Sequence, residues 1–208
     1  MNYLVVNGGI KKKDGKMKIK LLDLENKLGK KIKRNYTSIG VDTATSTGIG
    51  CISTNTKTVT IEWALIEFNA NSIQELYKQM YKEFGNFIDK KTNVCVVEDV
   101  FLGMNPDVTI KLARFGGLAI AQAINKNVHF ETIGAKSARA KLFKLDCKKW
   151  KGKTKEAVGN YLKSIGIEIN EHNCADGVLL AILGIIKDMD FRSKKEISKK
   201  RKKKGKKK

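Results

Sequence analysis

Three acidic residues stand where a carboxylate is energetically costly. Asp42 and Glu98 each follow directly on a short apolar run, and Asp176 stands just before a long one. A carboxylate beside apolar residues loses hydration unless a cation meets it. The three are explained together if they bind divalent cations through their oxygen atoms. Two such cations can activate a water and stabilise the leaving oxygen of a phosphodiester, so these residues predict phosphodiester hydrolysis.

Each acid also has a structural alternative to weigh. Asp42 is acceptable as a turn residue, and Asp176 as an acid near the positive end of a helix dipole. Glu98 fits neither description, because it follows a continuous apolar run that is typical of a buried strand. The metal-binding interpretation therefore explains more of the pattern than three separate structural roles do.

The net charge predicts a polyanionic partner. The 208 residues include 42 Lys and Arg against 21 Asp and Glu, a net charge of +21. Residues 192–208 hold twelve basic residues and one acidic residue, and +10 remains without them. A basic body with a basic tail favours nucleic acid. A non-enzymatic basic DNA-binding protein would explain this charge, but not the three carboxylates.

A membrane partner is not expected. The longest apolar stretch, 178–186, is half the length needed to cross a bilayer. Four cysteines without a C-x-x-C spacing are expected to be reduced thiols. We therefore expect a cytoplasmic protein, at the nucleoid or at a site of viral DNA replication.

The order of elements predicts an α/β fold of the ribonuclease H-like class, with a five-stranded mixed sheet flanked by helices. The expected strands are 36–42, 48–54, 58–68, 93–97 and 128–133, and the expected helices are 71–87, 107–125, 135–145, 153–165 and 173–189.

Three parts of the chain differ in composition. Residues 1–35 are expected to be a basic N-terminal extension, in which 3–6 pairs with 16–22 as a hairpin. Residues 36–190 are expected to form the nuclease domain. Residues 191–208 are expected to be a disordered Lys-rich tail.

Four segments resemble motifs of the RuvC-type Holliday junction resolvases, in the order and at about the spacing of that family. These are SIGVDTATSTG from Ser38, VEDVF from Val97, NPD through LARFGGLA from Asn105 to Ala119, and NCADGVLLAI from Asn173. The resemblance implies a crossover junction endodeoxyribonuclease that acts in DNA recombination and repair. A phage or viral member of the family is one alternative for this chain. It also implies a homodimer acting on four-way DNA junctions, with two Mg²⁺ ions per active site and Mn²⁺ as a substitute.

The resemblance assigns roles to particular residues. Asp42, Glu98 and Asp176 match the family's catalytic metal ligands. The family usually has Asp or His three residues before the last aspartate, and here that position holds Asn173. Its carbonyl oxygen is our candidate for the fourth ligand, and the neighbouring His172 is the alternative.

Other residues match positions that contact DNA or a second subunit. Phe101 matches an aromatic residue that probes the bases of the junction, although a core phenylalanine is an equal alternative. The basic residues expected near the scissile phosphate are Lys136, Arg139, Lys141 and Lys155. Gly116-Gly117 within a helix indicates close approach of another element, and the family uses this helix for dimerisation.

Two other enzyme classes share part of this pattern. Sugar kinases and actin-like ATPases also open with an aspartate and a small-residue turn, but they need a second lobe that this chain is too short to supply. A ribonuclease H-like nuclease that cuts RNA–DNA hybrids, flaps or generic branched DNA stays open as an alternative.

Overall fold

The computed structural model describes residues 3–6, 10–100, 105–143 and 154–191. Its strands are β1 (Tyr3–Val6), β2 (Ile10–Lys20), β3 (Tyr36–Asp42), β4 (Ser46–Thr54), β5 (Thr58–Glu67), β6 (Val94–Asp99) and β7 (His129–Gly134). Its helices are α1 (Leu21–Leu28), α2 (Ile73–Phe87), α3 (Pro106–Asn125), α4 (Ala135–Phe143), α5 (Thr154–Ser164) and α6 (His172–Ile185).

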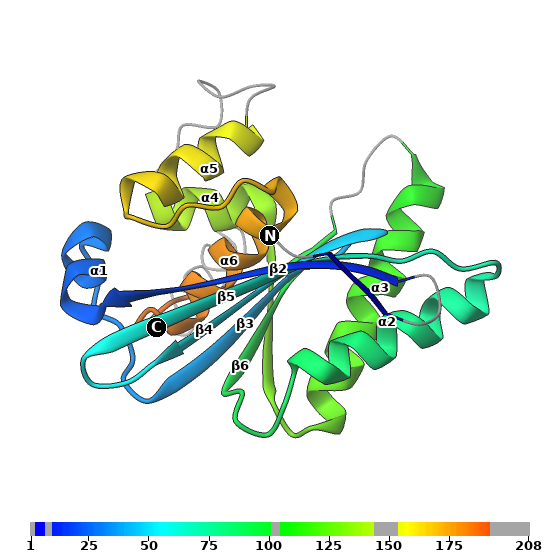
Figure 1. The fold of residues 1–208 in the computed structure, drawn as a ribbon, viewed down its shortest axis with the longest axis horizontal. Helices are drawn as coiled ribbons and strands as arrows, with labels where there is room; N and C mark the ends of the chain where they lie inside the picture. Colours follow the sequence, from blue (N-terminus) through cyan, green and yellow to red (C-terminus); the bar gives the residue numbers. More distant parts are fainter. Residues whose placement is uncertain (1–2, 7–9, 101–104, 144–153, 192–208) are drawn as a thin grey trace, which may run out of the picture.

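The strands form one mixed sheet in the order β1-β2-β5-β4-β3-β6-β7 (Figure 1). Strands β3, β4 and β5 form an antiparallel meander, and β6 and β7 continue the sheet parallel to β3. These are the five strands that the sequence predicted, so the α/β ribonuclease H-like class is confirmed. The sheet is wider than predicted, because the N-terminal segment adds β2 and β1 to it.

The N-terminal hairpin has a different register from the expected one. Strand β1 pairs with residues 10–13 of β2, not with 16–22. The alternating pattern that suggested a strand starts earlier, at Ile10, and all of 11–20 pairs with β5. Because β1 has four residues and its Val6 pairs with Ile10, β1 reaches no further along β2 than Lys13. The extension is thus joined to the rest of the sheet over the length of a strand.

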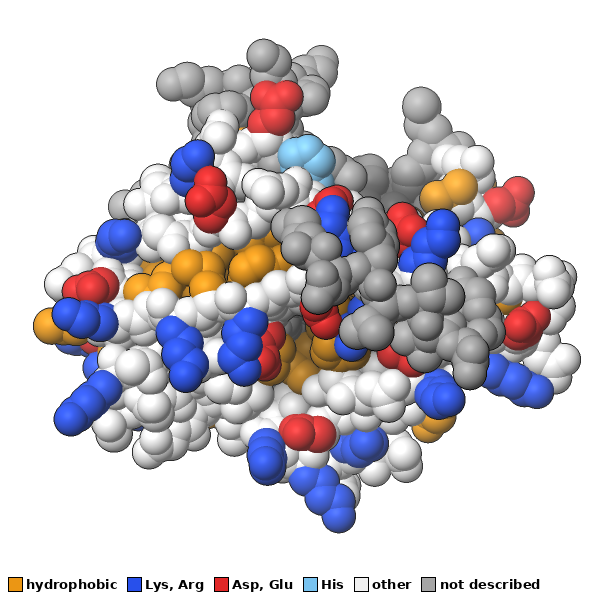
Figure 2. All heavy atoms as spheres, in the orientation of Figure 1, with side chains coloured by type: hydrophobic (Ala, Val, Ile, Leu, Met, Phe, Trp, Pro, Cys, Tyr) orange, Lys and Arg blue, Asp and Glu red, His pale blue; other side chains and the backbone are white. Residues whose placement is uncertain are grey.

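Two apolar clusters fill the two faces of the sheet. On one face α2 and α3 pack with Phe84 and Phe115 against Val41 and Val97. On the other face α1, α4, α5 and α6 pack on the sheet, with α6 almost wholly buried (Figure 1). Figure 2 shows the seam between this helical layer and the sheet as a band of hydrophobic side chains.

Glycines let α6 lie directly on the sheet. A Cβ atom on Gly40 would stand 2.1 Å from the carbonyl oxygen of Gly177, and one on Gly48 would stand 1.9 Å from that of Asn173. No side chain fits in either place, so the backbone of α6 is in contact with β3 and β4. This contact fixes the position of the first turns of α6 over the end of β3.

Helix α6 ends at Ile185, not near Met189 as the sequence suggested. Ile186 is extended and forms a bridge with Ile32, and the amide of Lys187 donates to the carbonyl of Lys31 at 2.9 Å. The apolar run continues past the helix, but the residues after Ile185 form backbone hydrogen bonds with the segment after α1 instead of continuing the helix. The expected tail from Arg192 onward lies outside the described residues.

Candidate active site

Asp42 and Glu98 stand side by side at the ends of two neighbouring parallel strands. The register pairs Val41 with Val97, so the next residue on each strand is one of the two acids. Neighbouring strands are about 4.8 Å apart. Strand β6 runs to Asp99, so Glu98 lies within the strand rather than after it, and both acids are half-buried.

Both acids point to the face that α6 covers. Successive side chains of a strand alternate between faces. On β3, Ser38 and Gly40 contact α6, so Asp42 belongs to the same face. On β6, Val94 and Val96 belong to the cluster around α6, so Glu98 shares that face. The sheet therefore presents two carboxylates beneath the N-terminal half of α6.

Asp176 lies in the second turn of α6 and is only 6% exposed. The helix begins at His172, so Asp176 is beyond the first turn, where the helix dipole acts most strongly. Arg139 of α4 meets it instead, with Nη2 donating to both carboxylate oxygens at 3.0 and 3.3 Å. The buried carboxylate thus has the cationic partner that its burial requires.

The donors on this face suit a hard divalent cation, because carboxylate oxygens are its preferred ligands. The described residues contain no group of three or more His, Cys, Asp or Glu side chains that could hold a metal ion, so the structure does not gather Asp42, Glu98 and Asp176 into one such group. The guanidinium supplies the positive charge that a divalent cation would otherwise bring to Asp176. The residue types fit a metal, and Arg139 is the group that a metal at Asp176 would have to displace.

Asn173 lies over the end of the meander, where its Nδ2 donates to the carbonyl of Ser46 at 2.7 Å. It is not the cap of α6, because Glu171 occupies that position. His172 is exposed to solvent. The structure thus ties the asparagine, rather than the histidine, to the first residue of β4.

The buried thiol of Cys174 lies among several charged groups at the N-terminus of α6. Burial raises the pKa of Cys174 to about 12, and the charges of Glu171, Lys13 and Asp42 act on it as well. Lys13 of β2 forms an ion pair with Glu171. A lysine from the N-terminal extension therefore reaches the N-terminus of α6.

Residues 38–183 match the model of the crossover junction endodeoxyribonuclease RuvC family. The chain belongs to the RuvC family. Members of this family are nucleases that depend on divalent metal ions, and this chain is a crossover junction endodeoxyribonuclease by that membership.

Solved structures show the same fold. The structure of Thermus thermophilus RuvC in complex with a Holliday junction substrate is 14% identical, with a TM-score of 0.58 over 71% of this chain and 90% of that one. A structure of Thermus thermophilus RuvC alone is 14% identical, with a TM-score of 0.56 over 73% of this chain and 98% of that one. No curated protein matches the chain. None of the helices in the described residues is long and apolar enough to span a membrane.

The basic residues expected near the DNA of a RuvC nuclease are spread over different surroundings. Arg139 lies at Asp176, whereas Lys136 is exposed one turn earlier on α4. Lys141 donates to the backbone carbonyl of Asp190. Phe101 and the side chain of Lys155 lie outside the described residues.

The two glycines of α3 face different ways. A Cβ atom on Gly116 would stand 3.6 Å from Val97 Cγ1, so Gly116 packs toward β6. A Cβ atom on Gly117 would have no other atom within 4 Å, so Gly117 is open to the outside. Ile110 and Ile124 on the same helix are 49% and 59% exposed. The surface around Gly117 is therefore partly apolar and is not covered by any described part of this chain.

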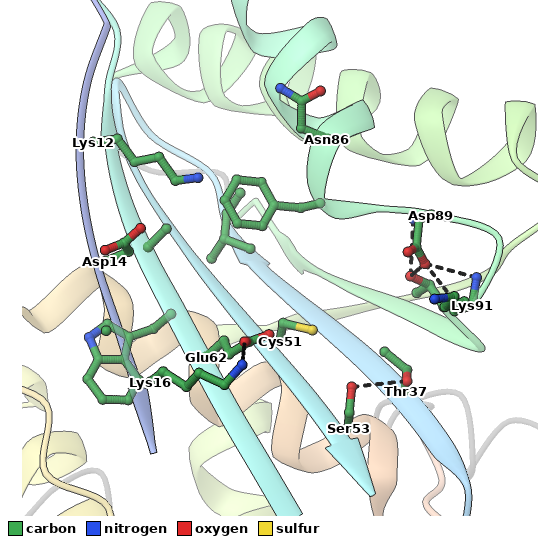
Figure 3. Close-up of a pocket in the computed structure, with 16 residues that line it drawn as sticks. Lys12, Asp14, Lys16, Thr37, Cys51, Ser53, Glu62, Asn86, Asp89 and Lys91 are labelled. Carbon is green, nitrogen blue, oxygen red and sulfur yellow. Dashed lines mark hydrogen bonds and ion pairs between the residues drawn. The ribbon is translucent and has the colours of Figure 1, made fainter. Parts of the chain in front are cut away.

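A cavity of about 570 Å³ lies on the opposite face of the sheet, beside the end of α2 (Figure 3). Its polar side chains largely satisfy one another: Lys16 pairs with Glu62, and Thr37 bonds to Ser53 at 3.1 Å. The three candidate carboxylates do not line it. The cavity is therefore separate from the candidate active site.

The sequence did not reveal two of the interactions at this site. Arg139 was expected at a phosphate, and nothing in the sequence linked it to Asp176. Lys13 was assigned only to a basic extension. Neither interaction has a local signal, because each joins residues that the fold brings together from distant parts of the chain.

Proposed function

We propose that this protein hydrolyses phosphodiester bonds in four-way DNA junctions, with Asp42, Glu98 and Asp176 as the carboxylate ligands of two Mg²⁺ ions. The observation that carries the assignment is the register of β3 and β6, which puts two acids next to each other beneath α6. Asn173 is the proposed fourth oxygen ligand, and Mn²⁺ is expected to replace Mg²⁺.

The ions, when bound, would supply the charge that activates water and stabilises the leaving oxygen. The chain's own residues set the geometry. Asp42 and Glu98 are held by a paired sheet, and Asp176 is held by a helix in backbone contact with that sheet. Rigid elements of this kind hold reacting groups more precisely than loops do.

Arg139 has two roles in this proposal. Without a metal, its guanidinium balances the charge of Asp176. If that carboxylate held a cation, the guanidinium would be available for a backbone phosphate of the DNA, a group that arginine binds well. The exchange keeps Asp176 paired in both states.

We propose that the protein acts as a homodimer in which α3 faces its copy. The outward position of Gly117, between the exposed Ile110 and Ile124, favours close approach of a second helix. Closed two-fold symmetry is the commonest arrangement of homo-oligomers. A two-fold dimer places two active sites on the two strands of a junction that must be cut.

The test is a parallel cleavage assay on a four-way junction, a flap, an RNA–DNA hybrid and a linear duplex of matched sequence, in Mg²⁺ and in Mn²⁺. We expect paired cuts in the junction and little cleavage of the duplex. The Asp42→Asn protein serves as the control for contaminating nucleases. Faster cleavage of the hybrid or the flap than of the junction would assign the protein another substrate.

A further inference from the structure

One row of backbone pairing crosses the sheet from the N-terminal extension to the candidate active site. Lys13 of β2 pairs with Leu65, Leu65 pairs with Gly48, and Gly48 pairs with Asp42. Three strand spacings of about 4.8 Å place the backbones of Lys13 and Asp42 about 14 Å apart. Lys13 is therefore in register with the active site, although it precedes the family-matched segment.

Lys13 also shares the face of the sheet that carries Asp42. Directly paired residues point their side chains to the same face. A Cβ atom on Gly48 would meet the backbone of Asn173, which identifies this face as the one under α6. The Lys13 side chain is 18% exposed and pairs with Glu171, the residue that caps α6. The first turn of α6 thus lies between the lysine and Asp42.

Lys13 belongs to a basic region that the family match leaves out. Residues 38–183 hold 18 basic and 15 acidic residues, and residues 1–37 hold eleven basic and three acidic ones. Lys11 and Lys13 line a small cavity of about 200 Å³ together with Glu67 and Glu171. Among residues 1–183, the surplus positive charge is thus concentrated on residues 1–37.

We propose that Lys13, with Lys11 beside it, binds the backbone phosphates of the DNA strand being cut, a few nucleotides from the scissile phosphate. This inference rests on the proposed function of the neighbouring site. Phosphate contacts from lysine set the register of a protein on DNA without reading its sequence. Lys13 is therefore a positioning residue, and the added strand β2 extends the DNA-binding surface of the nuclease.

Glu171 makes the proposal testable in two directions. Its carboxylate holds the Lys13 ammonium at the edge of the site, and it also competes with an incoming phosphate for that ammonium. Removing the lysine charge should weaken DNA binding, whereas removing the glutamate charge should strengthen it. If the ion pair only fastened β2 to α6, either change would lower stability and neither would change the affinity of the folded protein for DNA.

The first experiment measures binding of a four-way junction to the full-length protein in EDTA, over a range of salt concentrations. Lys13→Met should lower the affinity by about tenfold. It should also reduce the log–log salt slope by about 0.9. Lys18→Met is the matched control, because Lys18 is exposed on the same strand, in a row that leads through Thr60 and Ser53 to Thr37 and not to Asp42. Glu171→Gln should raise the affinity several-fold, and thermal melting reports whether each variant is folded.

The second experiment replaces single phosphates around the cleavage point with neutral methylphosphonates. Neutralising the phosphate that Lys13 binds should lower the affinity of the wild-type protein for the junction and leave the affinity of Lys13→Met unchanged. Neutralising any other contacted phosphate should lower the affinity of both proteins equally. Equal sensitivity at every position, with Lys13→Met binding like Lys18→Met, would overturn the proposal. If Lys13→Met does not fold, an unchanged affinity in Glu171→Gln would overturn it. Failure of the wild-type protein to prefer junctions would refute the proposed function, and the phosphate scan would still decide the role of Lys13 on duplex DNA.

Discussion

The family-matched segment and the segment before it differ in net charge and in the candidate catalytic residues that they contain. Residues 38–183 are nearly balanced in charge and contain all three candidate carboxylates, whereas residues 1–37 are strongly basic and contain none of them. Catalysis needs a few groups held in fixed positions. Affinity for DNA needs positive charge spread over a surface. If the proposed roles hold, this chain keeps its chemistry in the family fold and gains affinity for DNA from the segment before it.

The two regions are nevertheless one sheet. Strand β2 pairs with β5 along ten positions, and the segment after α1 pairs with the residues after α6. Within the extension the buried Glu25 accepts from the amide of Ile32 and from Arg34, which fixes the return to β3. The added charge is therefore held in a defined position relative to the active site. The division of residues 1–35, 36–190 and 191–208 stays a prediction.

The largest expected effect is on the chemistry of the family-matched segment. Asp42→Asn, Glu98→Gln and Asp176→Asn should each lower the cleavage rate at saturating junction by at least about 1,000-fold, or about 4 kcal/mol of barrier. Binding should be retained, because neutralising an acid removes repulsion of phosphate. Asp99→Asn is the matched control, since this exposed neighbour of Glu98 points to the other face of β6. A rate within about tenfold of wild type for any of the three, or about 1.4 kcal/mol of barrier, would refute its role as a ligand.

A charge on the outer face of α3 should break the dimer without touching the carboxylates. An uncompensated charge buried at an interface costs about 3–5 kcal/mol, so Gly117→Glu should raise the dimer dissociation constant at least about a hundredfold. Sedimentation velocity measures this, and Gln74→Glu on the exposed side of α2 is the control. A wild-type protein that sediments only as a monomer at micromolar concentration, with and without junction, would rule out the dimer.

The Arg139–Asp176 ion pair gives a test of metal binding within the family-matched segment. Arg139→Met leaves a buried carboxylate unpaired, which should lower the free energy of unfolding by about 3 kcal/mol in EDTA. Magnesium should restore more stability to this variant than to the wild type, because binding to the folded state stabilises it. Melting curves with and without Mg²⁺ measure both effects, and Lys136→Met on the same helix is the control. Equal stabilisation of the variant and the wild type would show that no cation reaches Asp176.

Much of the family-matched segment was predictable because its signals are local. Short runs of β-branched and apolar residues predicted β3 to β7, and Ser72 caps α2 as expected, with its side chain accepting from the amide of Glu75. The placing of Asp42 and Glu98 at strand ends also follows from their immediate neighbours. The metal-site roles of these residues stay a prediction.

The interactions that the sequence did not predict all join distant residues. The helix pattern of α6 continues beyond Ile185, but the bridge from Ile186 to Ile32 ends it. Lys13 and Glu171 are 158 residues apart. Periodicity reports which face of an element is apolar, and it does not report which other segment will compete for the backbone. The N-terminal extension was therefore the region where prediction was weakest.

A smaller effect is expected at Asn173, where the chain departs from the family pattern. Asn173→Asp should lower the Mg²⁺ concentration for half-maximal cleavage a few-fold, because a carboxylate neutralises more of a dication than an amide does. Asn173→Ala should raise it. Both variants lack the donor to Ser46 and should show a similar decrease in stability, so opposite shifts in metal dependence cannot arise from folding. His172 is exposed, and His172→Ala should leave the midpoint unchanged. A shift in His172→Ala alone would make the histidine the ligand.

The smallest effect on selectivity is expected from the basic residues 192–208, which lie at the other end of the chain from β2 and outside the family-matched segment. Deleting residues 192–208 removes twelve basic residues and should weaken binding to junction and duplex alike. The log–log salt slope should fall by about 0.9 for each phosphate that the tail no longer neutralises. The ratio of junction to duplex affinity and the cleavage rate at saturating junction should both stay the same, because binding to phosphate carries no information about branching unless the fold positions the basic groups. Lys13→Met, in contrast, removes one charge in register with Asp42. It should change which phosphates affect the affinity of the protein when they are neutralised. A truncated protein without a preference for junctions would place recognition of the branch in the tail and reverse the comparison.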